Sequence, residues 1–123
     1  MGLDMFLNKQ RADFKIELDP EGYWRKANAI HRWFVLHVQG NVDNCDEYEV
    51  KVDELRELMI LCKKVLRDRD LAPELLPTKE GFFFGNYEYN QYYFSDLKLT
   101  VKIIANLIKN HEPGDTYYYQ SSW

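Results

Sequence analysis

Residues 53–67, DELRELMILCKKVLR, carry the clearest structural pattern in the sequence. Apolar side chains recur here every three or four positions, which places them on one face of an α-helix and the charged side chains on the other. Asp53 is well suited to cap the start of this helix. We therefore predict an amphipathic helix with an apolar face that includes Cys62 and comprises Leu55, Leu58, Met59, Cys62, Val65 and Leu66.

The chain before this stretch predicts a strand and an earlier helix. In residues 48–52 a tyrosine and two valines alternate with charged residues, as in a short, half-buried strand. Further upstream, apolar side chains with helical spacing follow Pro20, and Gly40-Asn41 is a typical helix end. His31 is expected to face the interior, because it shares the apolar face formed by Trp24, Ala27, His31, Phe34, Val35 and Val38.

Downstream, prolines interrupt the chain before a third helix begins. Pro73 and Pro77 mark the break, and the three phenylalanines at 82–84 predict a brief strand that ends at residues 85–86, Gly-Asn. The third helix is predicted from about residue 90 to residue 110. Its buried stripe comprises Tyr93, Leu97, Val101, Ile104, Leu107 and Ile108.

The two ends of the sequence predict strands that pair with each other. Leu3, Met5 and Leu7 alternate with other residues, as in a strand with one buried face, and the polar residues 8–19 then predict a loop. The closing residues 116–123, TYYYQSSW, favour β-structure. We therefore predict a single α+β domain over residues 1–123, in which three main helices pack on a small, mainly antiparallel sheet that includes both terminal strands.

Composition limits the classes of function. A chain of 123 residues with 46% hydrophobic and 15% aromatic residues can bury one core, and no apolar run is long enough to span a membrane. The sequence starts without an export signal, so we expect a cytoplasmic protein with reduced thiols. A net charge of −4 argues against a dedicated nucleic-acid binder. Nucleotide-binding and hydrolase motifs are missing, which favours a protein that is not an enzyme.

His31, Cys45 and Cys62 are the candidate metal ligands, because imidazole and thiolate are the groups that tetrahedral zinc prefers. His31 lies nine positions before the end of the first helix at Gly40, and Cys62 lies nine positions after the start of the second at Asp53. If these helices pack antiparallel, the two side chains lie at matching heights. The alternative is an ordinary core histidine and two unliganded cysteines. The fourth ligand stays open among Asp43, Asp46, Glu47 and His37.

Three other groups of side chains stand out beside these ligands. The segment 43–49 carries four acidic residues, and residues 87–94 are too rich in aromatic side chains for one helical stripe to bury them all. Tyrosine is enriched at protein interfaces because it combines apolar area with a polar group. A basic cluster also crowds the end of the second helix and comprises Lys63, Lys64, Arg67 and Arg69.

Four blocks of the sequence carry a resemblance that spans nearly the whole chain: MGLDMFL, GYWRKANAIHRWF, LLPTKEGFFFGNYEY and YYYQSSW. Together they resemble a family of small proteins of phages and their bacterial hosts that typically begin MGLDMYL and end YYQSSW. Phe6 replaces the more usual tyrosine. Positions that match His31, Cys45 and Cys62 recur in that family, so the resemblance implies a structural zinc ion at these residues.

The sequence is also similar to metal-containing phage anti-CRISPR proteins that bind the recognition lobe of a type II CRISPR effector nuclease and hinder loading of target DNA. The resemblance implies a stoichiometric inhibitor of host defence that binds its target with a rigid acidic and aromatic surface. Two alternatives stay open: a small enzyme, and a regulator that binds nucleic acid through the basic cluster of residues 63–69. The expected partner-binding residues are Asp43, Asp46, Glu47, Glu49, Tyr87 and Tyr89.

Overall fold

Four strands in the described part of the chain form one antiparallel sheet that joins its two ends. In the computed structural model, which describes residues 2–11, 20–79 and 88–123, the strands are β1 (Asp4–Gln10), β2 (Gly22–Arg25), β3 (Tyr48–Val50) and β4 (Thr116–Ser122). Their order across the sheet is β2-β1-β4-β3. The N-terminal and C-terminal strands are neighbours at its centre, with Leu7 opposite Tyr119. The predicted pairing of the termini is therefore confirmed.

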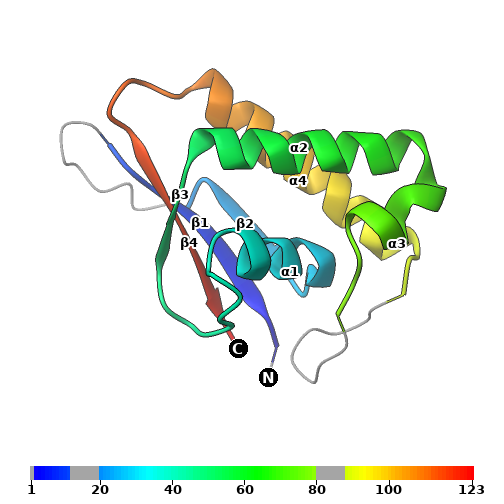
Figure 1. Cartoon of the computed structure of the whole chain (residues 1–123). Helices are drawn as coiled ribbons and strands as arrows, with labels where there is room; N and C mark the ends of the chain where they lie inside the picture. Colours follow the sequence, from blue (N-terminus) through cyan, green and yellow to red (C-terminus); the bar gives the residue numbers. More distant parts are fainter. Residues whose placement is uncertain (1, 12–19, 80–87) are drawn as a thin grey trace.

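The helices all lie on one side of this sheet (Figure 1). They are α1 (Asn28–His37), α2 (Val52–Arg67), α3 (Ala72–Leu75) and α4 (Gln91–Lys109), with a short 3-10 turn at Arg69–Leu71 before α3. The most extensive helix contact joins α2 to α4. The predicted α+β class is confirmed, and the short helix α3 is an addition to the three helices expected from the sequence. Pro73 lies in its first turn, where the missing N–H of proline costs no helical hydrogen bond.

One cluster of buried side chains fills the space between the sheet and the helices. Every second residue of the central strands points into it, such as Met5, Leu7, Tyr117 and Tyr119. The helices contribute buried side chains at helical spacing, and Cys62 on α2 is among them. The inward directions predicted for His31 and Cys62 are confirmed, since the exposed fractions of these residues are 1% and 0%.

The structure corrects the predicted start of the first helix. Trp24 lies in strand β2 and pairs with Met5 of β1, and helix α1 begins only at Asn28. Lys26, directly after the strand, has a φ of +54°, a left-handed conformation that ends the strand and turns the chain toward the helix. The helix was predicted to include Trp24 because two buried residues three positions apart are typical of a helix. Trp24 and Ala27 are indeed buried, but they lie on either side of this turn.

Two further boundaries differ from the prediction. Helix α2 begins at Val52 and not after Asp53, because the Glu54 carboxylate accepts a hydrogen bond of 2.9 Å from the Lys51 N–H and so starts the helix earlier. Strand β1 continues to Gln10, through residues expected to form a loop. The predicted strand at residues 82–84 lies outside the described residues. Within the described ranges, no helix has the length and apolarity needed to cross a lipid bilayer.

Candidate functional site

A chain of hydrogen bonds runs through His31 from the surface to the core. Its Nε2 lies 2.9 Å from Oδ1 of Asp43, and its Nδ1 lies 2.6 Å from the hydroxyl of Tyr119. Burial lowers the pKa of His31, and the Asp43 carboxylate opposes this shift. The neutral ring satisfies both contacts when Nε2–H donates to Asp43 and Nδ1 accepts from the Tyr119 hydroxyl.

This chain of bonds connects three separate parts of the fold. His31 belongs to α1, Asp43 to the segment that leads into β3, and Tyr119 to the central strand β4. The Tyr119 ring also stacks on Phe34 of α1, with centroids 3.8 Å apart and planes 5° from parallel. Burial raises the pKa of Tyr119 well above its ordinary value, so its hydroxyl stays protonated. The arrangement fixes Asp43, and with it the start of the acidic segment.

Two more hydrogen bonds hold the acidic segment, residues 43–49, against the end of β4. Gln120 Nε2 donates to the backbone oxygen of Cys45 at 3.1 Å, and Ser121 Oγ donates to that of Asn44 at 3.3 Å. Asn44 Oδ1 in turn accepts from the Asp46 N–H at 3.1 Å, which closes a tight local turn. The backbone of the segment is therefore bonded to side chains of β4 at two successive residues, Asn44 and Cys45.

The acidic side chains of this segment take two different roles. Asp46, Glu47 and Glu49 are exposed, whereas Asp43 is half-buried against His31. Glu49 contacts the ammonium group of Lys51, and in the described part of the chain neither Asp46 nor Glu47 forms an ion pair. Three of the four predicted acidic contact residues thus project outward together. The sequence offered Asp43 as a surface contact and as a candidate fourth metal ligand. In the structure its carboxylate contacts His31 and fixes the base of the segment.

A cavity of about 280 Å³ lies beside the same histidine. Arg32 and Lys79 bring two cationic groups to it, and Lys79 lowers the pKa of His31 by charge repulsion. The backbone of Lys79 is held by the Asn28 amide, which accepts from its N–H and donates to its carbonyl, each at 2.5 Å. The complete described lining is His31, Arg32, Val35, Leu36, Asn41, Asp43 and Lys79.

The three predicted zinc ligands occupy three different environments. Cys45 is exposed in the acidic segment, and Cys62 is buried in the core, where burial raises its pKa to about 12. Both ring nitrogens of His31 are hydrogen-bonded. The sequence argument assumed that the helices carrying His31 and Cys62 pack against each other, which would place the two side chains at the same level. In the structure α2, which carries Cys62, packs mainly on α4 and not on α1. Among the described residues, no group of three or more His, Cys, Asp or Glu side chains is placed to hold a metal ion.

The aromatic residues near the start of α4 divide between surface and core. Tyr89 and Tyr92 have exposed fractions of 38% and 68%, whereas Tyr93 and Phe94 are buried. The Tyr89 hydroxyl accepts a hydrogen bond of 3.2 Å from the Thr78 N–H, which fixes its position. Tyr87, the other predicted aromatic contact, lies outside the described residues. The prediction that one helical stripe cannot bury all the aromatic side chains of this stretch is confirmed.

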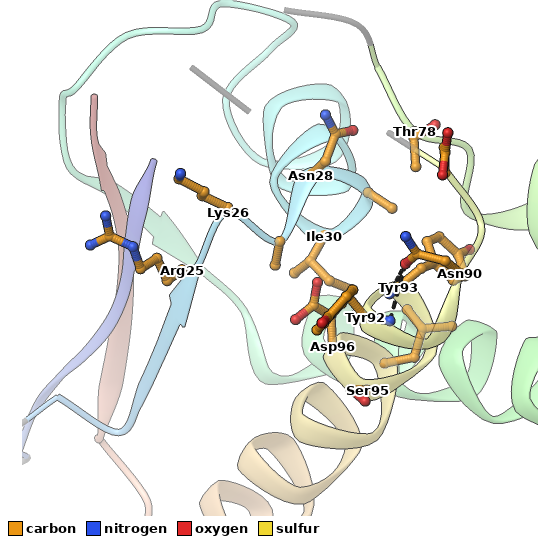
Figure 2. Close-up of a pocket in the computed structure, with 14 residues that line it drawn as sticks. Arg25, Lys26, Asn28, Ile30, Thr78, Asn90, Tyr92, Tyr93, Ser95 and Asp96 are labelled. Carbon is orange, nitrogen blue, oxygen red and sulfur yellow. Dashed lines mark hydrogen bonds between the residues drawn. The ribbon is translucent and has the colours of Figure 1, made fainter. Parts of the chain in front are cut away.

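Sequence reasoning missed a second cavity, of about 300 Å³, between the start of α1 and the first turns of α4 (Figure 2). Asp96 of α4 lines it, and burial raises the pKa of this carboxyl to about 7. The sequence contained a signal for this site. Asp96 lies three positions after Tyr93 and four before Thr100, which places an acidic residue on the inner face of the helix.

None of the family models, curated proteins or solved structures compared with the chain matches it significantly. The candidate sites are therefore described by their own geometry, which consists of a fixed acidic segment supported by His31 and a separate cavity that contains Asp96.

Proposed function

We propose that this chain is a phage-encoded accessory protein that inhibits host defence by stoichiometric binding to a host protein. The target that fits best is a type II CRISPR effector nuclease, with loading of target DNA as the step that is hindered. The proposal combines the sequence resemblance with one structural observation. That observation is the acidic segment, in which Asp46, Glu47 and Glu49 project outward from a backbone bonded to β4.

The charge of this segment suits the proposed target. Type II effector nucleases hold the guide and target strands in a positively charged channel. Exposed carboxylates at Asp46, Glu47 and Glu49 attract such a surface and speed association with it, because opposite charges steer the encounter. An inhibitor with this geometry occupies cationic groups that the phosphates of target DNA would otherwise contact.

The rigidity of the segment favours binding as well. Ordering a flexible loop at an interface costs free energy, and a loop already held by hydrogen bonds avoids most of that cost. The chain from Asp43 through His31 to Tyr119 links the segment to the core, so its shape persists without the partner. Tyr89 and Tyr92 add exposed aromatic area elsewhere on the molecule, of the kind found at the centres of protein interfaces.

Association kinetics with a purified, guide-loaded type II effector nuclease test this proposal. The site variant combines Asp46→Asn, Glu47→Gln and Glu49→Gln. The matched control removes the same number of exposed charges elsewhere with Glu57→Gln, Asp70→Asn and Glu74→Gln. We expect the site variant to associate about tenfold more slowly at low salt, and the control variant to stay within about twofold of wild type.

Three results would count against the proposal. Absence of a complex would exclude this target, and an equal loss in both variants would remove the role of the acidic segment. An association rate unaffected by ionic strength would show that charge does not steer binding. Salt-sensitive binding of the isolated protein to DNA would instead favour a nucleic-acid regulator that acts through the basic cluster of residues 63–69.

A further inference from the structure

The cavity beside His31 is lined by three donor side chains that have no partner. These are Arg32, Asn41 and Lys79, and within the described residues none of their side chains forms a hydrogen bond or an ion pair. Guanidinium and ammonium groups only donate hydrogen bonds, and the NH₂ of an amide donates two. Unused donors around one cavity are complementary to a ligand that is rich in acceptor atoms.

Two observations place Lys79 beside this cavity. The side-chain amide of Asn28, which is buried in the first turn of α1, accepts from the Lys79 N–H and donates to its carbonyl, each at 2.5 Å. The Lys79 ammonium group also acts on the His31 ring, because its positive charge lowers the pKa of that ring. The first observation fixes the backbone of Lys79, and the second brings its charge close to a residue that lines the cavity.

Arg32 and Asn41 come to the same cavity from α1 and from the turn that follows it. Arg32 is half-buried on the helix. Asn41 has a left-handed backbone with a φ of +65°, a conformation that asparagine accepts more readily than most residues. Its N–H donates to the Val35 carbonyl at 2.8 Å, which brings the turn back alongside the end of α1. The Asn41 side chain stays exposed and unengaged.

The charge of the described lining is positive. Arg32 and Lys79 carry one positive charge each, and Asp43 carries the one negative charge. The Asp43 carboxylate lies 2.9 Å from Nε2 of His31, so it is already engaged. With a neutral His31 ring, one positive charge beside the cavity has no counterpart. A ligand with an anionic group would compensate it.

We infer that this cavity binds the oxyanion group of a small molecule, a phosphate or a carboxylate, which accepts hydrogen bonds from Arg32, Asn41 and Lys79. A guanidinium group suits both anions, because its N–H groups match two oxygens at once. Val35 and Leu36 offer apolar surface to the rest of the ligand, and a volume of about 280 Å³ suits a small one. A neutral ligand would leave the positive charge uncompensated, and a cation would add to it.

Titration of isotope-labelled protein with four probes, followed by NMR, tests this inference. Butyl phosphate and valerate carry an oxyanion on the same butyl chain, whereas butan-1-ol carries no charge and butylamine a positive one. Sodium chloride keeps the ionic strength constant, so that screening is equal for all four probes.

We expect at least one of the two anions to bind with a Kd of about 5 mM or lower. Its binding should shift the backbone N–H signals of Arg32, Leu36 and Asn41. Butan-1-ol and butylamine should bind more weakly by about tenfold or more, because they lack the charge-assisted hydrogen bonds.

Three single variants each remove one of the donors. Arg32→Gln and Lys79→Gln remove a positive charge and should weaken anion binding about tenfold. Asn41→Gly removes the amide but accepts the same left-handed backbone, and should weaken binding about threefold. These residues are exposed or half-buried, so the variants should keep the fold. Lys63→Gln removes an exposed charge on α2 and is the matched control, which should bind as wild type does.

Several results would overturn the inference. If neither anion shifts the named signals, the cavity does not bind oxyanions. Equal binding of butan-1-ol would indicate an apolar pocket, and equal or tighter binding of butylamine a cation site at Asp43. Unchanged binding by all three folded variants would place the anion elsewhere, and an equal loss in Lys63→Gln would indicate non-specific attraction.

The preferred head group identifies the source of the ligand. Tighter binding of butyl phosphate indicates a phosphorylated molecule, and tighter binding of valerate a carboxylic acid, and either result supports the inference. Loss of anion binding leaves the proposed inhibitor function untouched, because Asp46, Glu47 and Glu49 do not line this cavity.

Discussion

Both ring nitrogens of His31 are hydrogen-bonded, although the sequence offered this residue as a metal ligand. Helical spacing was enough to predict that the ring points inward. It was not enough to predict the partners, because Asp43 and Tyr119 lie 12 and 88 positions away along the chain. A buried histidine needs polar partners of some kind, and the fold supplies them from a loop and from the central strand.

The hydroxyl of Tyr119 provides a direct test of this arrangement. The substitution Tyr119→Phe keeps the ring that stacks on Phe34 but leaves Nδ1 of His31 without its partner in the core. We expect the free energy of unfolding to fall by about 1–3 kcal/mol, measured by urea denaturation. The control Tyr118→Phe removes a half-buried hydroxyl with contacts of 3.4 and 3.5 Å and should cost less than about 0.5 kcal/mol. Equal losses in the two variants would contradict this account.

Asp96 should give the protein a stability that depends on pH. Its pKa is about 7 in the folded protein, raised by burial, against about 3.9 in the unfolded chain. The folded state therefore holds the proton more tightly, and the contribution of this group to the free energy of unfolding falls as the pH rises from about 4 to 7.

Asp96→Asn removes this titration. The variant should exceed wild type in stability at pH 8 by on the order of 1–2 kcal/mol, a value reduced for the solvent contact of a half-buried side chain. The advantage should disappear as the pH falls below about 4, where the unfolded as well as the folded wild type becomes protonated at this group. Denaturation curves measured in urea at several pH values would show this. A constant difference between the two proteins across that range would contradict it.

The zinc prediction rests on the residue types and on the family resemblance. Elemental analysis of protein purified without a metal-affinity tag measures it directly. A structural zinc predicts one metal ion per chain and its loss from a His31→Ala variant. Metal well below one ion per chain in wild type would contradict the prediction and leave His31 as a hydrogen-bonded core residue, the arrangement described for it above.

Long periodic elements were the predictable part of the fold. Helix α4 matches its prediction closely, because Asn90 caps it and a full apolar stripe follows. The pairing of β1 with β4 was also predicted, from alternation at one end of the chain and β-propensity at the other. The four-residue strand β2 was not, because Trp24 and Ala27 suit either a helix or a strand followed by a turn. Local spacing cannot separate these cases, since pairing with β1 decides between them.

The continuation of β1 beyond Leu7 shows the same limitation. Asn8 and Gln10 are polar, and Lys9 stands where the alternation of Leu3, Met5 and Leu7 would place a buried residue. A charged residue at a buried position argues against a strand, so the sequence predicts a loop. In the structure, Lys9 lies 3.3 Å from Asp115 and 3.8 Å from Glu21, and these carboxylates compensate its charge. The long partner strand β4 provides hydrogen bonds for the extra residues. Both effects come from residues distant in sequence.

The close approach of β2 to α4 can be tested at Gly22. A Cβ atom at this position would lie 2.6 Å from Cγ2 of Ile103, a stiff, buried side chain on α4. Gly22→Ala should therefore destabilise the protein by about 1–3 kcal/mol, through displacement of the strand from the helix. Thermal and urea denaturation both measure this change.

The double variant Gly22→Ala/Ile103→Ala shows whether contact is the cause. Ile103→Ala alone leaves a cavity and costs about 2–4 kcal/mol, but it also makes room for the new methyl group. The combined loss should be clearly smaller than the sum of the two single losses. Additive losses would mean that Gly22 is required for another reason, such as its backbone conformation.

At the scale of the whole molecule, charge is unevenly distributed. The acidic segment leads into β3, and the basic cluster of residues 63–69 lies at the far end of α2, on the opposite side of the molecule (Figure 1). A net charge of −4 hides this separation. Such a distribution orients a protein as it approaches a cationic surface, so that the acidic end arrives first. The sequence predicted the two groups of charges, but their separation in space follows from the fold.

Titration of the protein into a DNA-cleavage assay tests the central claim most directly. The assay uses a guide-loaded type II effector nuclease at a concentration well above the dissociation constant of the complex. A stoichiometric inhibitor predicts that cleavage falls linearly and ends at a fixed small ratio of protein to nuclease. The site variant with the three changes at residues 46, 47 and 49 should require a large excess. Complete inhibition by a small fraction of an equivalent, as an enzyme would produce, or full cleavage in the presence of a large excess, would contradict the account.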